Sequence, residues 1–171
     1  IDLLAIHGIN TFELLHQAIR SGGCVDVLRK WQKDNLIGHI GFSTHGSLSL
    51  IQKAISTNKF DFVNLHWYFI NQTNIEAIKL AKAFDLGVFI ISPTDKGGHL
   101  HTPSDKMIKL CEPLHPIVFN DLFCLSNNYV HTLSVGVAKE TDFDYHLEAI
   151  ALLQQSKDFV SSIESKLIQE L

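Results

Sequence analysis

The sequence predicts an α/β fold of the barrel type, in which helices alternate with the strands of a parallel sheet. Short apolar runs without polar alternation, typical of strands covered on both faces, alternate with stretches of helical periodicity along the 171 residues. Strands that are separated by helices imply right-handed crossovers and therefore parallel neighbours. No Gly-x-Gly-x-x-Gly follows a predicted strand, which favours a barrel over a doubly wound dinucleotide-binding sheet.

The first half of the chain alternates between apolar strands and helices with recognisable ends. A pair of glycines at 22 and 23 ends the first helix, and Ser47 is a typical N-cap for the third. The second helix is predicted from the helical spacing of Val25, Leu28 and Trp31. Strands are predicted over 1–8, 36–43 and 60–65, and helices over about 11–20, 24–35, 47–56 and 74–84.

The second half begins with a strand over 87–92, followed by a long irregular loop that contains glycines and prolines. A short helix is predicted after Ser104, a further helix over 116–125 and a fifth strand over 130–135. The remainder, from about 143, is predicted to be helical. Its last helix has an apolar stripe that consists of Phe159, Val160, Ile163, Leu167 and Ile168.

The composition limits the class of protein. The net charge is −4 and Lys and Arg do not cluster, so we expect no nucleic acid and no membrane as a partner. No apolar stretch approaches the roughly 20 residues of a membrane span. The three cysteines are widely spaced and odd in number, which favours reduced thiols in a cytoplasmic protein over a disulfide framework.

Polar or small residues stand where the predicted strands end. In parallel α/β folds the chemistry lies at the carboxyl ends of the strands, so these positions are the candidates for a functional site. They are His7, Ser43 with Thr44, Asn64, Ser92 and Gly136.

Three segments, Asp2-Leu3-x-x-x-His7, Ile40-Gly41-Phe42-Ser43 and Ile91-Ser92-Pro93, resemble the aldo-keto reductase family in their order and spacing. The family is an eight-stranded (β/α) barrel that reduces carbonyls with NADPH or, less often, NADH. The resemblance covers about 1–146 and implies strands four to eight of a partial (β/α)8 TIM barrel, with the N-terminal strands absent. We therefore expect one partial barrel domain over 1–171. The similarity is greatest to a subgroup often followed by a ferredoxin-like iron–sulfur module, although the sequence has no cysteine cluster of that kind.

The resemblance also implies roles for single residues. His7 matches the histidine that orients and polarises the substrate carbonyl. Ser43 matches the residue that binds the nicotinamide carboxamide, Thr44 stands where many members have Asn, and Asn64 takes the place of the Gln or Asn on the carboxamide's other side.

Other matched positions concern the rest of the cofactor. Ile91 replaces a Tyr that stacks on the nicotinamide in many members. Residues 92–98, with Ser92, Lys96 and Gly97, match the loop that crosses the pyrophosphate, where glycines permit close approach to an anion. Lys139 follows the last strand, where the family binds the adenosine phosphate. These matches imply NADP(H), with NAD(H) as the second choice.

The many histidines raise the question of a metal site, but the sequence does not predict one. His99-x-His101 and Cys111-x-x-x-His115 each lack a second pair at the usual spacing. We expect His16, His39 and His146 at the surface or at caps, and the tryptophans 31 and 67 in the core.

The first hypothesis is a fragment of an NAD(P)H-dependent oxidoreductase that acts on a small-molecule aldehyde or ketone. The family's Tyr, Lys and Asp have no match in the sequence, so the isolated chain should show no reductase turnover. The alternative is a non-catalytic, nucleotide-binding or regulatory relative. A barrel lyase or isomerase would need a Schiff-base Lys or a carboxylate base at a strand end, which the sequence does not indicate. The oligomeric state is left open.

Overall fold

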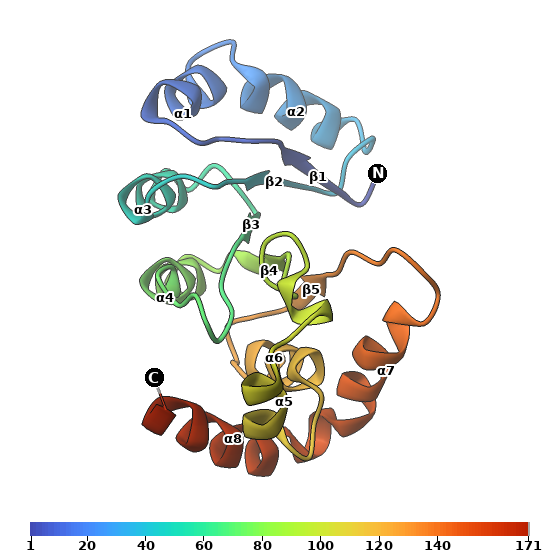
Figure 1. The fold of residues 1–171 in the computed structure, drawn as a ribbon. Helices are drawn as coiled ribbons and strands as arrows, with labels where there is room; N and C mark the ends of the chain where they lie inside the picture. The colour runs from blue at the N-terminus through green and yellow to red at the C-terminus, as the bar shows by residue number, and fades with distance from the viewer. Residues whose placement is uncertain (171) are drawn as a thin grey trace. The chain divides into compact units, whose positions relative to one another are not determined.

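A computed structural model describes residues 1–170 of the protein. Its five strands alternate with helices and follow one another in the order β1-β2-β3-β4-β5, which confirms the α/β class (Figure 1). The chain forms two compact units, Ile1–His66 with Thr73–Phe89 and Trp67–Gln72 with the residues from Ile90 onward. A single domain over 1–171 stays a prediction, and its last residue lies outside the described residues.

The first unit contains three parallel strands and the helices that alternate with them. Its elements are β1 (Leu3–Ile6), α1 (Phe12–Ile19), α2 (Cys24–Lys33), β2 (His39–Ser43), α3 (Leu48–Ser56), β3 (Phe62–Leu65), α4 (Ile75–Ala83) and the beginning of β4 (Gly87–Ile91). Ile6 lies opposite Phe42, and Ser43 opposite Asn64, in the parallel register. Apolar residues of β2, β3 and α3 form the centre of this unit; Ile40, Phe42, Ile51, Ile55 and Val63 are fully buried.

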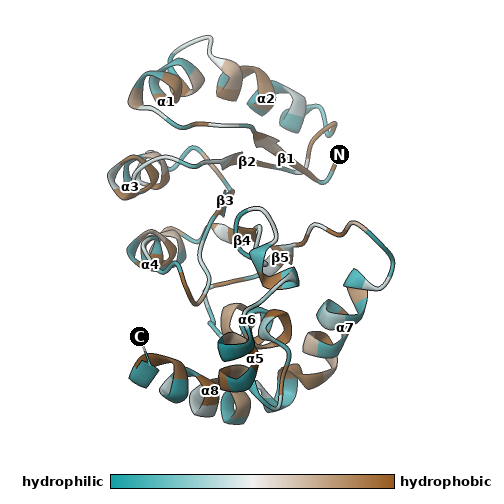
Figure 2. Ribbon diagram, viewed as in Figure 1, coloured by the Kyte–Doolittle hydropathy of each residue, from teal (hydrophilic) through white to brown (hydrophobic). Residues whose placement is uncertain are grey.

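Two expectations for the first unit are wrong. Strand β1 is apolar throughout (Figure 2), but Leu3 is 45% exposed and the rest of the strand is half-buried. The reason is that β1 lies at the end of the strand order and, among the described residues, pairs with β2. Trp31 is also 45% exposed, whereas Val25 is buried. A residue six positions on is rotated by roughly 120° around a helix, so Trp31 leaves the buried face of α2.

The second unit is built around one buried helix. Its elements after β4 are a 3₁₀ turn at His99–His101, α5 (Asp105–Cys111), α6 (Pro116–Leu125), β5 (Thr132–Ser134), α7 (Asp142–Leu152) and α8 (Ser156–Glu170). Helix α6 is buried from its first residue to Cys124 and packs against α5, α7 and α8 (Figure 1). Trp67 is buried in this unit, as predicted. Within residues 1–170, no helix has the length and apolar character needed to span a membrane.

The C-terminal part differs from its prediction in two respects. A second 3₁₀ turn, Leu153–Gln155, separates α7 from α8, although no Gly or Pro marks a break. The apolar stripe of α8 is buried at Val160, Ile163 and Leu167, but Ile168 is exposed.

The prediction that His146 lies at the surface is wrong, because the residue is 7% exposed and its Nδ1 bonds to the Asp121 carboxylate. This buried pair joins α6 to α7. Burial raises the pKa of Asp121, and the bond to His146 opposes that rise. The prediction failed because the sequence does not show that Asp121, on another helix, is the partner of His146.

Candidate functional site

In the first unit, three of the predicted site residues come together at the carboxyl ends of adjacent strands. His7 directly follows β1, Ser43 ends β2, and Asn64 lies in β3 opposite Ser43. His7 Nδ1 is 3.1 Å from Ser43 Oγ. Because the strands are parallel, their carboxyl ends meet at one edge, so residues 21 to 36 positions apart in the sequence become neighbours.

The Ser43 hydroxyl connects the first two strand ends. Its Oγ accepts a hydrogen bond from the backbone N–H of Gly8 at 3.0 Å, which leaves one O–H to donate. If that O–H donates to His7 Nδ1, the ring carries its proton on Nε2. His7 is exposed, so its Nε2 could then donate a hydrogen bond to a ligand.

Asn64 adds an unsatisfied acceptor to this edge. Its backbone oxygen accepts from Thr44 N at 3.1 Å. Its side-chain Oδ1 is buried and has no hydrogen-bond partner within the described residues. Buried polar atoms are almost always paired, so an unpaired amide oxygen at a strand end is a candidate ligand contact.

Thr44 is occupied inside its own turn. Its hydroxyl donates to the backbone oxygen of Ile9 at 2.7 Å and accepts from the N–H of Gly46 at 2.9 Å. The side chain is buried. Thr44 therefore shapes the turn after β2 and has no donor left over for a ligand.

Two histidines beside this cluster were not singled out from the sequence. His66 Nε2 lies 2.9 Å from His45 Nδ1, and the ring centroids are 4.8 Å apart. His45 follows β2 and its N–H donates to Asn10 Oδ1 at 2.7 Å. The signal that could have identified them is their position, since both follow predicted strands within two residues of Ser43 or Asn64.

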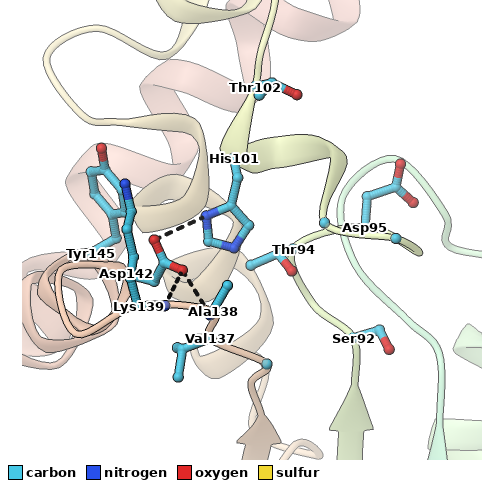
Figure 3. A pocket seen from close by; sticks show the side chains of 13 residues that line it. Ser92, Thr94, Asp95, His101, Thr102, Val137, Ala138, Lys139, Asp142 and Tyr145 are labelled. Carbon is cyan, nitrogen blue, oxygen red and sulfur yellow. Dashed lines mark hydrogen bonds and ion pairs between the residues drawn. The ribbon is translucent and has the colours of Figure 1, made fainter.

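In the second unit, two loops surround a pocket of about 870 Å³ (Figure 3). One loop follows β4 and the other follows β5. Of the predicted cofactor residues, Ser92, Gly97 and Lys139 line this pocket. Lys96 is exposed and is not among the lining residues. The remaining lining residues include the 3₁₀-turn residue His101 and two residues of α7, Asp142 and Tyr145.

The loop after β4 has an unusual backbone. Ser92 and Asp95 have φ values of 52° and 61°, and Gly97 and Gly98 have 85° and 75°. Left-handed conformations are disfavoured for Ser and Asp, so the surroundings must hold them. Asp95 does so in part, because its Oδ1 accepts from Tyr68 Oη at 3.2 Å and from the next backbone N–H at 2.7 Å. Burial and the Asp95 charge raise the pKa of Tyr68.

The loop after β5 is held by Asp142, a residue that was not predicted from the sequence. Its Oδ2 accepts from the backbone N–H groups of Ala138 at 2.9 Å and Lys139 at 3.2 Å. Its Oδ1 lies 4.0 Å from His101 Nδ1 (Figure 3). The Ala138 bond is the largest cause that lowers the pKa of Asp142, so the carboxylate is charged at neutral pH.

The residues considered for a metal site have other partners. His99 Nδ1 is 3.0 Å from Asp95 Oδ2. Cys111 is buried, which raises its pKa to about 11. His115 stacks on Tyr145 with ring centroids 4.0 Å apart, and burial lowers its pKa.

Comparison with solved structures identifies the arrangement of strands and helices. An aldo-keto reductase from Bacillus halodurans in its holo form superimposes with a TM-score of 0.73 over 95% of this chain, at 15% identity. The fold is that of part of an aldo-keto reductase barrel. The predicted partial (β/α)8 barrel is thus confirmed as a fold, while which five of the eight strands are present stays a prediction.

Two further solved structures superimpose on this chain with somewhat lower TM-scores. Glycerol dehydrogenase from Gluconobacter oxydans has a TM-score of 0.66 at 16% identity, and an aldo-keto reductase from a Medee basin deep-sea metagenome library has 0.57 at 12%. These structures cover 95% and 97% of this chain. The chain spans 58%, 58% and 60% of the three matched chains, the Bacillus protein included. No family model matches the sequence, and no curated protein does.

Proposed function

We propose that the chain carries nicotinamide-cofactor and carbonyl-orienting residues of an aldo-keto reductase. The observation that carries the proposal is the strand-end cluster of the first unit, where His7 bonds to Ser43 and Asn64 lies beside Ser43 in register. The resemblance assigns a carbonyl contact to the first residue and carboxamide contacts to the other two. A cytoplasmic protein that reduces a small aldehyde or ketone belongs to the same proposal.

The cluster fits a carboxamide in its hydrogen-bonding chemistry. A carboxamide presents an N–H₂ donor and a carbonyl acceptor. Asn64 Oδ1 is a buried acceptor without a partner among the described residues, so it could accept from the N–H₂ group. The Ser43 hydroxyl already accepts a hydrogen bond from Gly8 N–H and is hydrogen-bonded to His7 Nδ1. It could donate to the carboxamide only if its bond to the imidazole were broken.

The pocket of the second unit is large enough for a nucleotide. A volume of about 870 Å³ lies within the usual range for small-molecule sites. Gly97 permits close approach of a ligand, and Lys139 supplies a cation. The backbone N–H groups of Lys96 and Gly98 already bond to Asp95, so the loop offers fewer donors than its glycines suggest. The resemblance implies NADP(H) or NAD(H) for this site.

His7 would contribute orientation and hydrogen bonding to the reaction. With Nδ1 accepting from Ser43, Nε2 donates to the substrate carbonyl oxygen and polarises it. When bound, the nicotinamide cofactor would supply the hydride. The resemblance assigns the proton donor to a Tyr with no match in this sequence, so binding is a sharper test of this chain than turnover.

The test is a titration of the ¹⁵N-labelled chain with NADPH and then NADH, followed by amide chemical shifts. We expect shifts at Gly8, Ser43 and Thr44 and, in the second unit, at Gly97 and Lys139. Ser43→Ala and Asn64→Ala should each weaken binding roughly tenfold, the usual effect of one lost hydrogen bond.

A matched control is Ser56→Ala, which removes an exposed hydroxyl that donates to Gln52 O in α3. It should leave cofactor affinity unchanged. Binding that is absent with both cofactors, or that is equally weakened by Ser56→Ala, contradicts the proposal.

One observation favours the non-catalytic alternative as a second candidate. The hydroxyl of Thr44 is fully used within its turn, so one carboxamide contact that the family's Asn would provide has no counterpart here. Under this alternative the chain binds the dinucleotide but does not polarise a carbonyl. His7→Gln would then leave the binding of an aldehyde to the cofactor-bound chain unchanged, whereas the first proposal expects that binding to weaken.

A further inference from the structure

The pocket of the second unit has two carboxyl groups in its lining and no arginine among the described residues. Its ionisable lining side chains are Asp95, His101, Lys139, Asp142 and Tyr145. They comprise two carboxyl groups, one lysine, one histidine and one tyrosine. Lys139 is the one lysine among them, and its side chain is exposed.

Asp142 is a fixed anion in this pocket. The residue is 6% exposed and begins α7. Two backbone N–H groups hold its Oδ2, and these bonds lower its pKa. Its Oδ1 is 4.0 Å from His101 Nδ1, which is too long for a hydrogen bond. The Oδ1 atom therefore keeps an accepting lone pair while the other oxygen anchors the side chain (Figure 3).

Such a carboxylate discriminates between the two nicotinamide cofactors. NAD(H) and NADP(H) differ at the adenosine ribose, which has a 2′-hydroxyl in one and a 2′-phosphate in the other. A carboxylate accepts a hydrogen bond from a hydroxyl, as acidic side chains do in dinucleotide-binding sites, whereas a 2′-phosphate is accommodated by arginine. A phosphate monoester carries up to two negative charges, so a fixed anion repels it.

We infer that this pocket selects NAD(H) over NADP(H), and that Asp142 is the specificity-determining residue. The inference rests on the proposed function, because it assumes that the pocket takes the adenosine half of a nicotinamide dinucleotide. It reverses the cofactor preference implied by the family resemblance. Lys139 works against Asp142, but its backbone N–H is already held by the same carboxylate and its side chain is a mobile, solvent-exposed ammonium.

The first test compares NAD⁺ and NADP⁺ as probes of the unmodified chain, since the two differ only by the 2′-phosphate. Binding is measured by isothermal titration and by amide shifts of Ala138 and Lys139. We expect NAD⁺ to bind more tightly by roughly tenfold or more. Equal binding, or tighter binding of NADP⁺, overturns the inference while the proposed function stands. Absence of binding by both overturns the proposed function and this inference with it.

The second test asks whether Asp142 causes the preference for NAD⁺ over NADP⁺. Asp142→Asn keeps an oxygen that can accept from the two backbone N–H groups but removes the charge, and its N–H₂ can donate to a phosphate. We expect the ratio of the two affinities to fall by roughly tenfold, through weaker NAD⁺ and tighter NADP⁺ binding. The matched control is Asp144→Asn, which removes the same charge from an exposed position of α7 outside the pocket.

The control should keep the unmodified chain's ratio. If Asp142→Asn also keeps it, or if both variants change it equally, the assignment to Asp142 is overturned. If Asp142→Asn does not fold, Lys139→Ala provides the second variant. It should increase the preference for NAD⁺, and a decrease contradicts the inference.

Discussion

Asn120 carries the buried hydrogen bonds that hold the beginning of the pocket loop. Its Nδ2 donates to the backbone oxygen of Pro93 at 2.6 Å, and its Oδ1 accepts from the N–H of Phe69 at 3.0 Å. The residue is buried in α6. Asn120→Ala leaves two buried backbone groups unpaired, which should lower the free energy of unfolding by roughly 2–4 kcal/mol. Urea denaturation measures this loss.

The matched control for this prediction is Asn127→Ala. The Asn127 side chain also accepts a hydrogen bond from a backbone N–H, that of Tyr129 at 2.9 Å, but the bond is exposed. Water can replace it, so we expect a loss below roughly 1 kcal/mol. Equal losses in the two variants would mean that burial of the Asn120 bonds is not what stabilises the loop.

The residues of the candidate site that stand at strand ends could be predicted from the sequence. His7, Ser43 and Asn64 each stand at the end of an apolar run, and a parallel sheet brings such positions together. Asp142 was not predictable in this way. An acidic residue in the first turn of a helix usually serves the helix dipole and its free N–H groups, and its position in a pocket depends on how α7 packs in the second unit.

Helices α1, α3 and α5 begin after side chains that cap them, namely Thr11, Ser47 and Ser104. The clearest case is α3, where the Ser47 side chain accepts from the N–H of Leu50 at the first turn. Ser47→Ala removes this acceptor and should lower the free energy of unfolding by about 1 kcal/mol. Ser47→Asp, which also accepts at this position, should restore most of it. Chemical denaturation of the three proteins provides the measurement, and a Ser47→Asp variant no more stable than Ser47→Ala contradicts the capping role.

The ends of some elements were harder to predict from the sequence. The second strand was expected over 36–43 but begins at His39. Leu36 still belongs to the turn that follows α2, since its N–H bonds to Trp31 O. Likewise, the 3₁₀ turn at Leu153–Gln155 lacks a local signal. These ends are decided by tertiary packing, which overrides local propensity.

For the whole chain, the sequence pattern predicts some features of the structure and not others. Alternation of strands and helices predicts the α/β class and strand order, because crossovers are almost always right-handed and short. It does not predict how the chain divides into the two compact units, because that division depends on long-range contacts between side chains. The likeness to known barrels at 12–16% identity is also a likeness of fold, which does not by itself assign a function.

Exposed apolar residues on α7 predict how the whole molecule behaves in solution. Phe143, Leu147 and Ile150 recur at helical spacing on one face, and the last two are 60% and 62% exposed. The sequence pI is about 6.2, so charge repulsion between molecules is weakest near that pH. We expect concentration-dependent association at pH 6.2 that weakens at pH 8, measured by sedimentation velocity.

Substitution on α7 separates the apolar contribution from the electrostatic one. Combining Leu147→Lys with Ile150→Lys removes the apolar face and should give a monomer over a wider concentration range. Because both side chains are exposed, the free energy of unfolding should change by less than roughly 0.5 kcal/mol per site. Glu148→Lys, on the exposed surface of the same helix, changes the charge while leaving the apolar face in place. If Glu148→Lys suppresses association as strongly as the double variant, charge and not the apolar face controls the association.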